Sequence, residues 1–344
     1  MKPAPTRPPL DDRTIELALQ LLLGRPALDA AEVTALRGHR STATLRLELM
    51  RSPAFRAALP RDVTPASGTP FTLPLTLLRP PEDPALPWRF AEPDLRDPVC
   101  QLATAAQVET PDHLRWCGAL RQAPRWDAAQ WAQVWLLAAL EKAGLLKPGL
   151  RALGLDVAEG SLACLLAGHG HQVVVTPREG LSLDALFNRD LIAALAFAER
   201  VVPFEESTLG EFDLCWSNGS VERCGTRQAA LGLIEASLAW LKPGGVALHV
   251  LSFDLSSDDA ALESDSLVAL RRQDVLGLAT RLMALGHAIW PINLHPGTHP
   301  LDAEVDGEQG AALHLKREVA GHVLGTFGFA VRRADSPPSG VALP

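Results

Sequence analysis

The chain has 344 residues, of which 47% are hydrophobic, and a formal net charge of −8. This length suffices for one α/β domain and a smaller module, and the hydrophobic fraction can fill a sizeable core. The acidic balance argues against a nucleic-acid partner, because binding to phosphates needs a surface rich in Lys and Arg.

The N-terminal sequence and the cysteines indicate a cytoplasmic protein. The start, MKPAPTRPPLDD, has prolines where a signal peptide has its apolar core. No stretch approaches the roughly 20 apolar residues that a membrane-spanning helix needs. The five cysteines form no Cys-x-x-Cys pair, which suits buried thiols in a reducing compartment. We therefore expect a cytoplasmic protein without a membrane span.

Residues 1–60 are predicted to form a small all-α module. Asp11-Asp12 can cap a helix that ends near Gly24, and Ser41 can cap the last of three helices. The pattern LLGRP followed by SPAF resembles a short bacterial helical domain of unknown function, found in secreted repeat proteins and beside glycan-modifying enzymes. Because the module has no cluster of titratable groups, we expect it to serve stability or docking to a protein partner.

Residues 61–97 form a proline-rich connection. Between Leu59 and Pro98 the chain holds ten of its 28 prolines, a density that forbids regular helix and central strand. This segment is predicted to be an extended linker or a strap over the surface, and it marks the domain boundary.

Residues 98–148 are predicted to form two or three helices that lead into the second domain. Asp127 is the predicted N-cap of the last helix, which ends at Gly144. A stripe of apolar residues at helical spacing is predicted to lie in the core, because large aromatic side chains dominate buried area. The stripe consists of Trp131, Val134, Trp135 and Ala138.

Residues 149–335 alternate between strand and helix, and residues 336–344 are predicted to form a tail. Continuous apolar strands separated by helices indicate an α/β fold with a doubly wound, Rossmann-like sheet covered on both faces. In such a sheet the ligand lies outside the carboxyl ends of the strands, where the strand order reverses. Seven strands are predicted, at Arg151–Val157, Gln172–Thr176, Arg200–Val202, Phe212–Ser217, Val246–Ser252, Ala288–Asn293 and Gly325–Arg332.

This second domain resembles a subfamily of class I S-adenosylmethionine-dependent methyltransferases that is often found in bacterial glycan gene clusters. The resemblance covers about Pro98 to Arg333, including the helical lead. It is carried by FDLCWSNGSVERCG, LKPGGVALHVLSFDLSSDD, LRRQDVLGLATRLMALGHAI, HPLDAEVD and LHLKREVAGHVLGTFGFAVRR, in this order. The resemblance implies a seven-stranded sheet with an antiparallel final strand. It also implies S-adenosylmethionine over the first two strands and a glycan-related or small-molecule acceptor.

The resemblance places the cofactor beside the loop that follows the first strand. Relatives carry a glycine-rich loop like GFGVG where this chain has GLDVA, so that Asp156 and Ala158 replace two glycines. Glycines there let the backbone approach the methionine part of the cofactor. The cofactor-binding residues that the resemblance implies are Gly154, Asp156, Ala158, Gly160, Thr176, Pro177 and Ser217.

Two further positions depart from the family pattern. Relatives end the second strand with an acid that holds both ribose hydroxyls, whereas this chain has Thr176-Pro177. The loss of two charge-assisted hydrogen bonds, at roughly 1.5 to 3 kcal/mol each, predicts an affinity weaker by two to four orders of magnitude. In the fourth-strand loop Glu222 is kept, but Arg223 stands at the position of a histidine and stays protonated at neutral pH. Glu222 is therefore the candidate catalytic residue, near the acceptor.

These three altered loops leave two functions open. One is an active methyltransferase that binds the cofactor unconventionally and works mostly by proximity, with Glu222 taking a proton. The other is a pseudoenzyme, a non-catalytic methyltransferase fold that binds or scaffolds within a glycan-assembly complex. The fold alone does not decide between them.

The stretch HPGTHPLDAEVD contains His295 and His299, followed by Asp302 and Asp306. Two histidines at this spacing share a face only on a helix, which the neighbouring prolines prevent. We therefore predict no metal site. The methyltransferase resemblance places this loop over the acceptor side, where its His and Asp side chains can contact an acceptor group.

Overall fold

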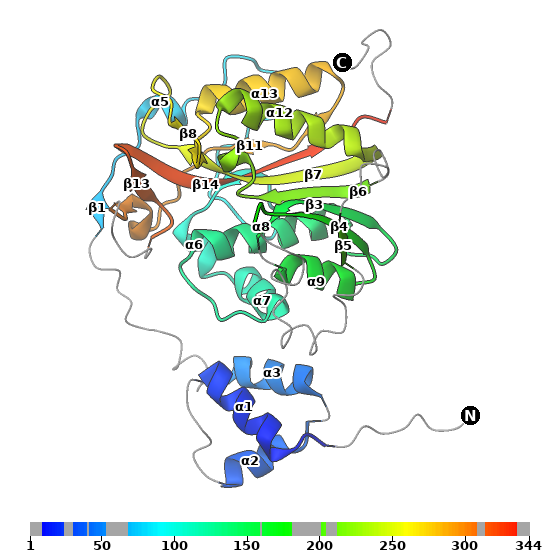
Figure 1. Ribbon diagram of the computed structural model, residues 1–344. Helices are drawn as coiled ribbons and strands as arrows, with labels where there is room; N and C mark the ends of the chain where they lie inside the picture. The colour runs from blue at the N-terminus through cyan, green and yellow to red at the C-terminus, as the bar shows by residue number, and fades with distance from the viewer. Residues whose placement is uncertain are drawn as a thin grey trace. The chain divides into compact units, whose positions relative to one another are not determined.

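The computed structural model describes residues 9–23, 30–39, 41–52, 68–158, 160–180, 201–203, 212–307 and 314–335. The chain divides into two compact units, Met1–Ala66 and Ser67–Pro344 (Figure 1). The boundary falls inside the predicted proline-rich connection. No helix in the described ranges is long and apolar enough to cross a membrane.

The first unit is the predicted all-α module. It contains α1 (Asp12–Leu23), α2 (Ala30–Leu36) and α3 (Thr42–Arg51). Both predicted caps are confirmed, since the Asp11 carboxylate accepts the Thr14 N–H at 2.7 Å and the Ser41 hydroxyl accepts the Thr44 N–H at 3.2 Å. The three helices share a small apolar core of Ile15, Leu19, Val33, Leu45 and Leu49.

The second unit is built on one mixed sheet. Strands β3 to β7 run parallel, and β14 is antiparallel to β7, so the predicted doubly wound, Rossmann-like sheet with an antiparallel final strand is confirmed. The order reverses at β3, which pairs with β4 on one side and β6 on the other. Along the sheet the strands are β11 (Ile292–Asn293), β2 (Cys100–Leu102), β14 (His322–Arg332), β7 (Leu241–Asp254), β6 (Phe212–Asn218), β3 (Arg151–Val157), β4 (Gln172–Pro177) and β5 (Val201–Pro203).

The sixth predicted strand is interrupted, and an unpredicted strand takes part of its place. β10 (Ala288–Ile289) pairs with β14, whereas β11 pairs with β2, a strand within the lead that the sequence predicted to be helical. Pro291 separates β10 from β11 and has no N–H for a ladder. Its carbonyl instead accepts the Cys100 N–H at 3.0 Å. After this proline the chain no longer pairs with β14 but with β2, and β2 in turn pairs with β14.

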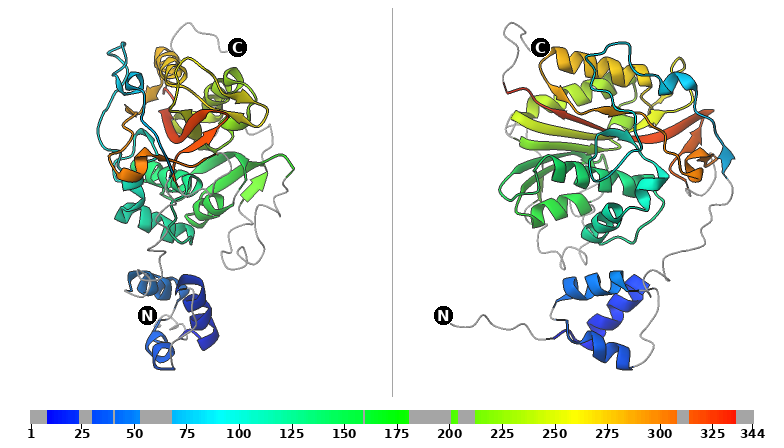
Figure 2. Two further views of the ribbon diagram at one scale, coloured as in Figure 1. Left: turned by 90° about the vertical axis from the view of Figure 1, so that its left-hand side faces the viewer. Right: turned by 180° about the vertical axis from the view of Figure 1, so that it is seen from behind.

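Helices cover both faces of the sheet, as Figures 1 and 2 show. One face carries α6 (Ala105–Val108), α7 (Pro111–Leu120), α8 (Ala128–Lys142) and α9 (Ser161–Gly168), and the other carries α12 (Arg227–Ser237) and α13 (Arg272–Ala284). The Asp127 carboxylate caps α8 through the Ala129 N–H at 2.8 Å, and Gly144 follows its end with φ of +71°. The predicted core stripe is confirmed as buried at Trp131, Val134, Trp135 and Ala138.

The described part of the proline-rich segment belongs to the second unit and forms a strap along its surface. β1 (Thr69–Pro70) pairs with β12 (Glu304–Val305), and α5 (Leu75–Leu78) follows it. The Arg89 N–H donates to the Ile292 carbonyl at 3.0 Å, which fixes the strap at the edge strand β11. Its leucines Leu77, Leu86 and Leu95 are buried.

Gly328 on β14 lies against the indole ring of Trp135 on α8. A Cβ added there would lie 2.3 Å from the ring, so the ring would have to move. We expect Gly328→Ala to lower the free energy of unfolding by about 1–3 kcal/mol, as overpacking does in other cores. Urea unfolding measures this loss.

The control is Gly232→Ala in α12, where no atom lies within 4 Å of the added Cβ. Alanine favours a helix interior, so this variant should be more stable by about 0.5–1 kcal/mol. Equal unfolding free energies for both variants would contradict the close packing of β14 on α8.

Candidate ligand-binding and active site

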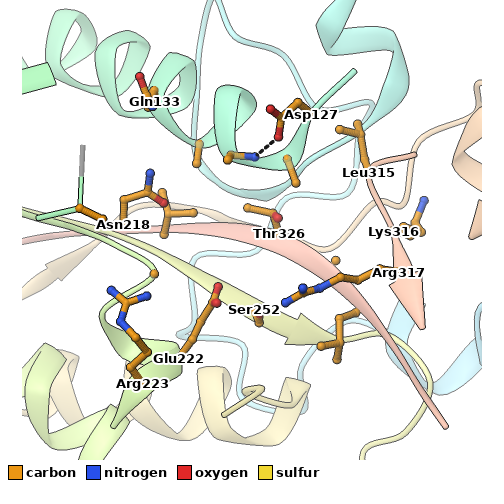
Figure 3. Close-up of a pocket in the computed structure, with 18 of the residues that line it drawn as sticks. Asp127, Gln133, Asn218, Glu222, Arg223, Ser252, Leu315, Lys316, Arg317 and Thr326 are labelled. Carbon is orange, nitrogen blue, oxygen red and sulfur yellow. Dashed lines mark hydrogen bonds between the residues drawn. The ribbon is translucent and has the colours of Figure 1, made fainter. Parts of the chain in front are cut away.

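A cavity of about 550 Å³ opens at the carboxyl ends of β3, β6 and β7. This is the point where the strand order reverses, so the cavity lies where the sheet topology predicts a ligand. Its walls come from α8, from the loops after β3 and β6, and from residues 314–319 (Figure 3). The volume falls in the range of roughly 300–1,000 Å³ that small-molecule pockets occupy.

The end of β3 keeps a backbone conformation that is typical of glycine, although its residue is an aspartate. Asp156 has φ of +48°, in the left-handed region that costs a non-glycine residue roughly 1–2 kcal/mol. Its N–H donates to Thr176 Oγ1 at 2.6 Å. Its carboxylate accepts from Arg223 Nε at 2.8 Å and also pairs with Nη2 of the same side chain. Asp156 therefore contacts both Thr176 and Arg223, the residues at the two other positions where the sequence departs from the methyltransferases that it resembles.

Gly154 makes room for an aromatic ring. A Cβ at Gly154 would lie 2.4 Å from the indole of Trp216, which lines the cavity and is 3% exposed. Glycine is therefore needed at this position because the Trp216 side chain, which comes from β6, packs against it. No larger residue fits at this position without displacing Trp216.

The other sequence-predicted residues divide between the cavity and its surroundings. Ala158 and Glu222 line the cavity. Gly160 precedes α9 as its N-cap residue, and Pro177 ends β4 opposite Val157. Gly160 and Pro177 lie close to the loop after β3 but do not line the cavity.

Ser217 lies away from the cavity, in contrast to the prediction. Its hydroxyl is 2.8 Å from His249 Nδ1, and His249 Nε2 is 3.0 Å from the Ser237 hydroxyl. Successive side chains of a strand point to opposite faces, so Trp216 and Asn218 line the cavity and Ser217 faces α12. Ser217 therefore belongs to a buried hydrogen-bond network.

Glu222 extends from the short 3-10 helix η3 (Val221–Arg223) into the cavity (Figure 3). Its carboxylate is hydrogen-bonded to Ser252. Burial raises the pKa of Glu222, while Ser252 and the nearby charges of Arg317, Arg223 and Arg178 oppose the rise. A buried carboxyl group with a raised pKa is a candidate for proton transfer or for a hydrogen bond to a ligand.

The structure adds residues that sequence reasoning missed. Asn218 and Arg317 point into the cavity (Figure 3). His314 also lines it, with Nδ1 2.6 Å from Asp306 Oδ1. Asp306 was included in the loop predicted to lie over the acceptor side, but the sequence has no periodic pattern that links it to His314.

Asp302 of that loop accepts the Ala105 N–H at 2.7 Å, and the two histidines accept hydrogen bonds from nearby backbone N–H groups. His295 Nδ1 accepts the Gly297 N–H, and His299 Nδ1 accepts the Leu301 N–H, each at 3.2 Å. Neither histidine lines the cavity. Across the part of the chain that the structure describes, no group of three or more His, Cys, Asp or Glu side chains could hold a metal ion.

No protein-family model matches the chain, and no curated protein matches it. Among solved structures, the chain is similar to the 1,6-didemethyltoxoflavin-N1-methyltransferase of Burkholderia thailandensis, with 16% identity, a TM-score of 0.38, and coverage of 60% of this chain and 79% of that chain. It is also similar to the CcbJ methyltransferase of Streptomyces caelestis, with 15% identity, a TM-score of 0.37, and coverage of 62% and 92%. The fold assignment rests on strand order and register.

Proposed function

We propose that the chain binds S-adenosylmethionine beside the loop after β3 and transfers its methyl group to a small molecule in the cavity. The observation that carries this proposal is the position of the cavity, at the reversal point of a doubly wound sheet whose final strand is antiparallel. A glycan-related acceptor and the glycan-cluster subfamily follow from the sequence resemblance and belong to the proposal.

The residues around the β3 loop fit this cofactor in a modified form. Arg223 lines the cavity, and Asp156 holds its Nε and Nη2, which orients the guanidinium. We assign Arg223 to the carboxylate of the methionine part, because arginine binds carboxylates with strong charged hydrogen bonds. Thr176 accepts the Asp156 N–H and retains its own hydroxyl hydrogen for a ribose oxygen.

A bound sulfonium cofactor supplies an activated methyl group. The chain itself supplies proximity, since α8 and residues 314–319 line the cavity in which both substrates would meet. Glu222, with its partner Ser252, lies in the cavity wall and would bind a polar group of the acceptor.

A second candidate is the pseudoenzyme, a non-catalytic binding or scaffold protein in a glycan-assembly complex. It is favoured by the Asp156–Arg223 ion pair, which occupies a position where relatives have glycine. In this case the N-terminal helical module, which resembles a domain found beside glycan-modifying enzymes, would bind a protein partner. For both candidates we propose a cytoplasmic location, which the free thiols of all five cysteines support.

Calorimetric titration of the full chain with S-adenosylmethionine and S-adenosylhomocysteine tests the proposal. We expect a dissociation constant near the micromolar range. Ala158→Phe places an aromatic ring in the cavity and should abolish the heat of binding. Gly232→Ala, a change on the outer surface of α12, should leave the heat of binding unchanged. No heat and no melting shift at millimolar ligand would refute cofactor binding and favour the pseudoenzyme.

A further inference from the structure

His314 and Asp306 form a buried pair in the wall of the cavity. Nδ1 of His314 lies 2.6 Å from Asp306 Oδ1, and the His314 backbone N–H donates to Oδ2 at 2.8 Å. The two side chains are 1% and 9% exposed. Both residues line the cavity, so the pair is a candidate for chemistry inside it.

The backbone around the pair is fixed on both sides. The Asp306 N–H donates to the Lys316 carbonyl at 3.0 Å, and the Asp306 carbonyl accepts the Glu318 N–H at 2.8 Å. β13 (Arg317–Val319) continues this contact into a hairpin with β14. A carboxylate mounted in this way holds the imidazole in one orientation, as sites of proton transfer require.

Among the residues that the structure describes, none is a hydrogen-bond partner of the second ring nitrogen of His314. Nε2 is buried and makes no hydrogen bond to any residue that the structure describes. Because Asp306 is an acceptor, the ring proton lies on Nδ1, and Nε2 keeps its lone pair. A buried polar atom without a partner destabilises the folded chain, so its presence calls for an explanation such as a ligand that supplies the missing donor.

His249, a buried histidine of the same unit whose contacts are purely structural, provides a comparison for His314. Both of its ring nitrogens lie within hydrogen-bond distance of serine hydroxyls, those of Ser217 and Ser237, and it lies on the far side of the sheet from the cavity. His314 differs in both respects, since one nitrogen is unused and the residue lines the cavity.

We propose that His314 accepts the proton of a hydroxyl group on the acceptor, so that the site methylates oxygen. This inference rests on the proposed function and names its substrate class, an alcohol or phenol. A lone pair of the acceptor oxygen forms the new bond to the methyl carbon, and the electron pair of the broken carbon–sulfur bond passes to the sulfur of the sulfonium donor. The hydroxyl proton moves to Nε2, and the Asp306 carboxylate stabilises the imidazolium.

The substrate class follows from the chemistry of the base. A carboxylate acceptor is already ionised at neutral pH and needs no proton acceptor, whereas an alcohol or phenol must lose its proton as the new bond forms. A histidine held by a carboxylate is suited to this loss. Glu222 then binds a second polar group of the acceptor, together with Ser252.

Nuclear magnetic resonance of the full chain, labelled with ¹⁵N in its histidine side chains, tests the proposal without a cofactor. His314→Gln assigns the signal, and the tautomer is measured in the unaltered protein. At pH 7.5 we expect the proton on Nδ1 and a bare Nε2. Phenol should shift the Nε2 signal, because its hydroxyl donates to this nitrogen, whereas anisole, in which a methyl group replaces that hydrogen, should leave it in place.

Two results would overturn the assignment of His314. One is a proton on Nε2 at pH 7.5, and the other is an Nε2 signal that phenol leaves unchanged or that anisole shifts equally. Failure of the proposed function has a different readout, the lack of heat in the S-adenosylhomocysteine titration. The two failures can therefore be told apart.

Discussion

Replacing Arg223 with alanine is expected to weaken the binding of S-adenosylhomocysteine by about 10- to 100-fold, as the loss of a charged hydrogen bond does. Arg223 lines the cavity, and Asp156, near the end of β3, aligns its guanidinium. If this cation holds the ligand carboxylate, its removal leaves that carboxylate without a charged partner. Calorimetric titration of the full chain measures the change.

The matched control is Arg227→Ala. Arg227 begins α12, pairs with Glu263 and does not line the cavity, so its removal should leave the affinity unchanged. Tighter binding by Arg223→Ala would contradict the prediction. That result would mean that the Asp156–Arg223 pair occupies the place of the cofactor, and it would favour the pseudoenzyme.

Acidification is expected to destabilise the second unit through His249. Burial lowers the pKa of His249 to about 3, against about 6.5 in the unfolded chain. Below pH 6.5 the unfolded state therefore binds more protons than the folded state, and stability falls as the pH falls from about 6.5 towards about 3. Between pH 7.5 and pH 4.5 this histidine alone should reduce the free energy of unfolding by about 3 kcal/mol.

Urea unfolding at the two pH values measures this loss, and His249→Gln isolates its source. The variant should lose about 3 kcal/mol less on acidification than the unaltered chain, although it is less stable at pH 7.5 because its contacts with Ser217 and Ser237 change. His169→Gln, at an exposed position, should keep the full pH dependence. An identical acid response in both variants would show that His249 is not the responsible group.

Sequence reasoning was most successful where the signal is local. The caps at Ser41 and Asp127 and the apolar stripe of α8 depend on neighbours within a few residues. The strand β2 escaped prediction, because its three residues lie at the start of a segment that was predicted to be helical, and its partner strand β11 lies far along the chain.

The sequence by itself predicted the α/β alternation, and its resemblance to methyltransferases identified three loops with altered residues. Only the tertiary structure decided what the altered residues do. Asp156 and Arg223 are 67 positions apart and form an ion pair, and Trp216 occupies the space that Gly154 leaves. Local periodicity reports which face a side chain takes, whereas the pairing of Asp156 with Arg223 depends on how the sheet brings distant parts of the chain together. Such long-range contacts have no signature in a single sequence.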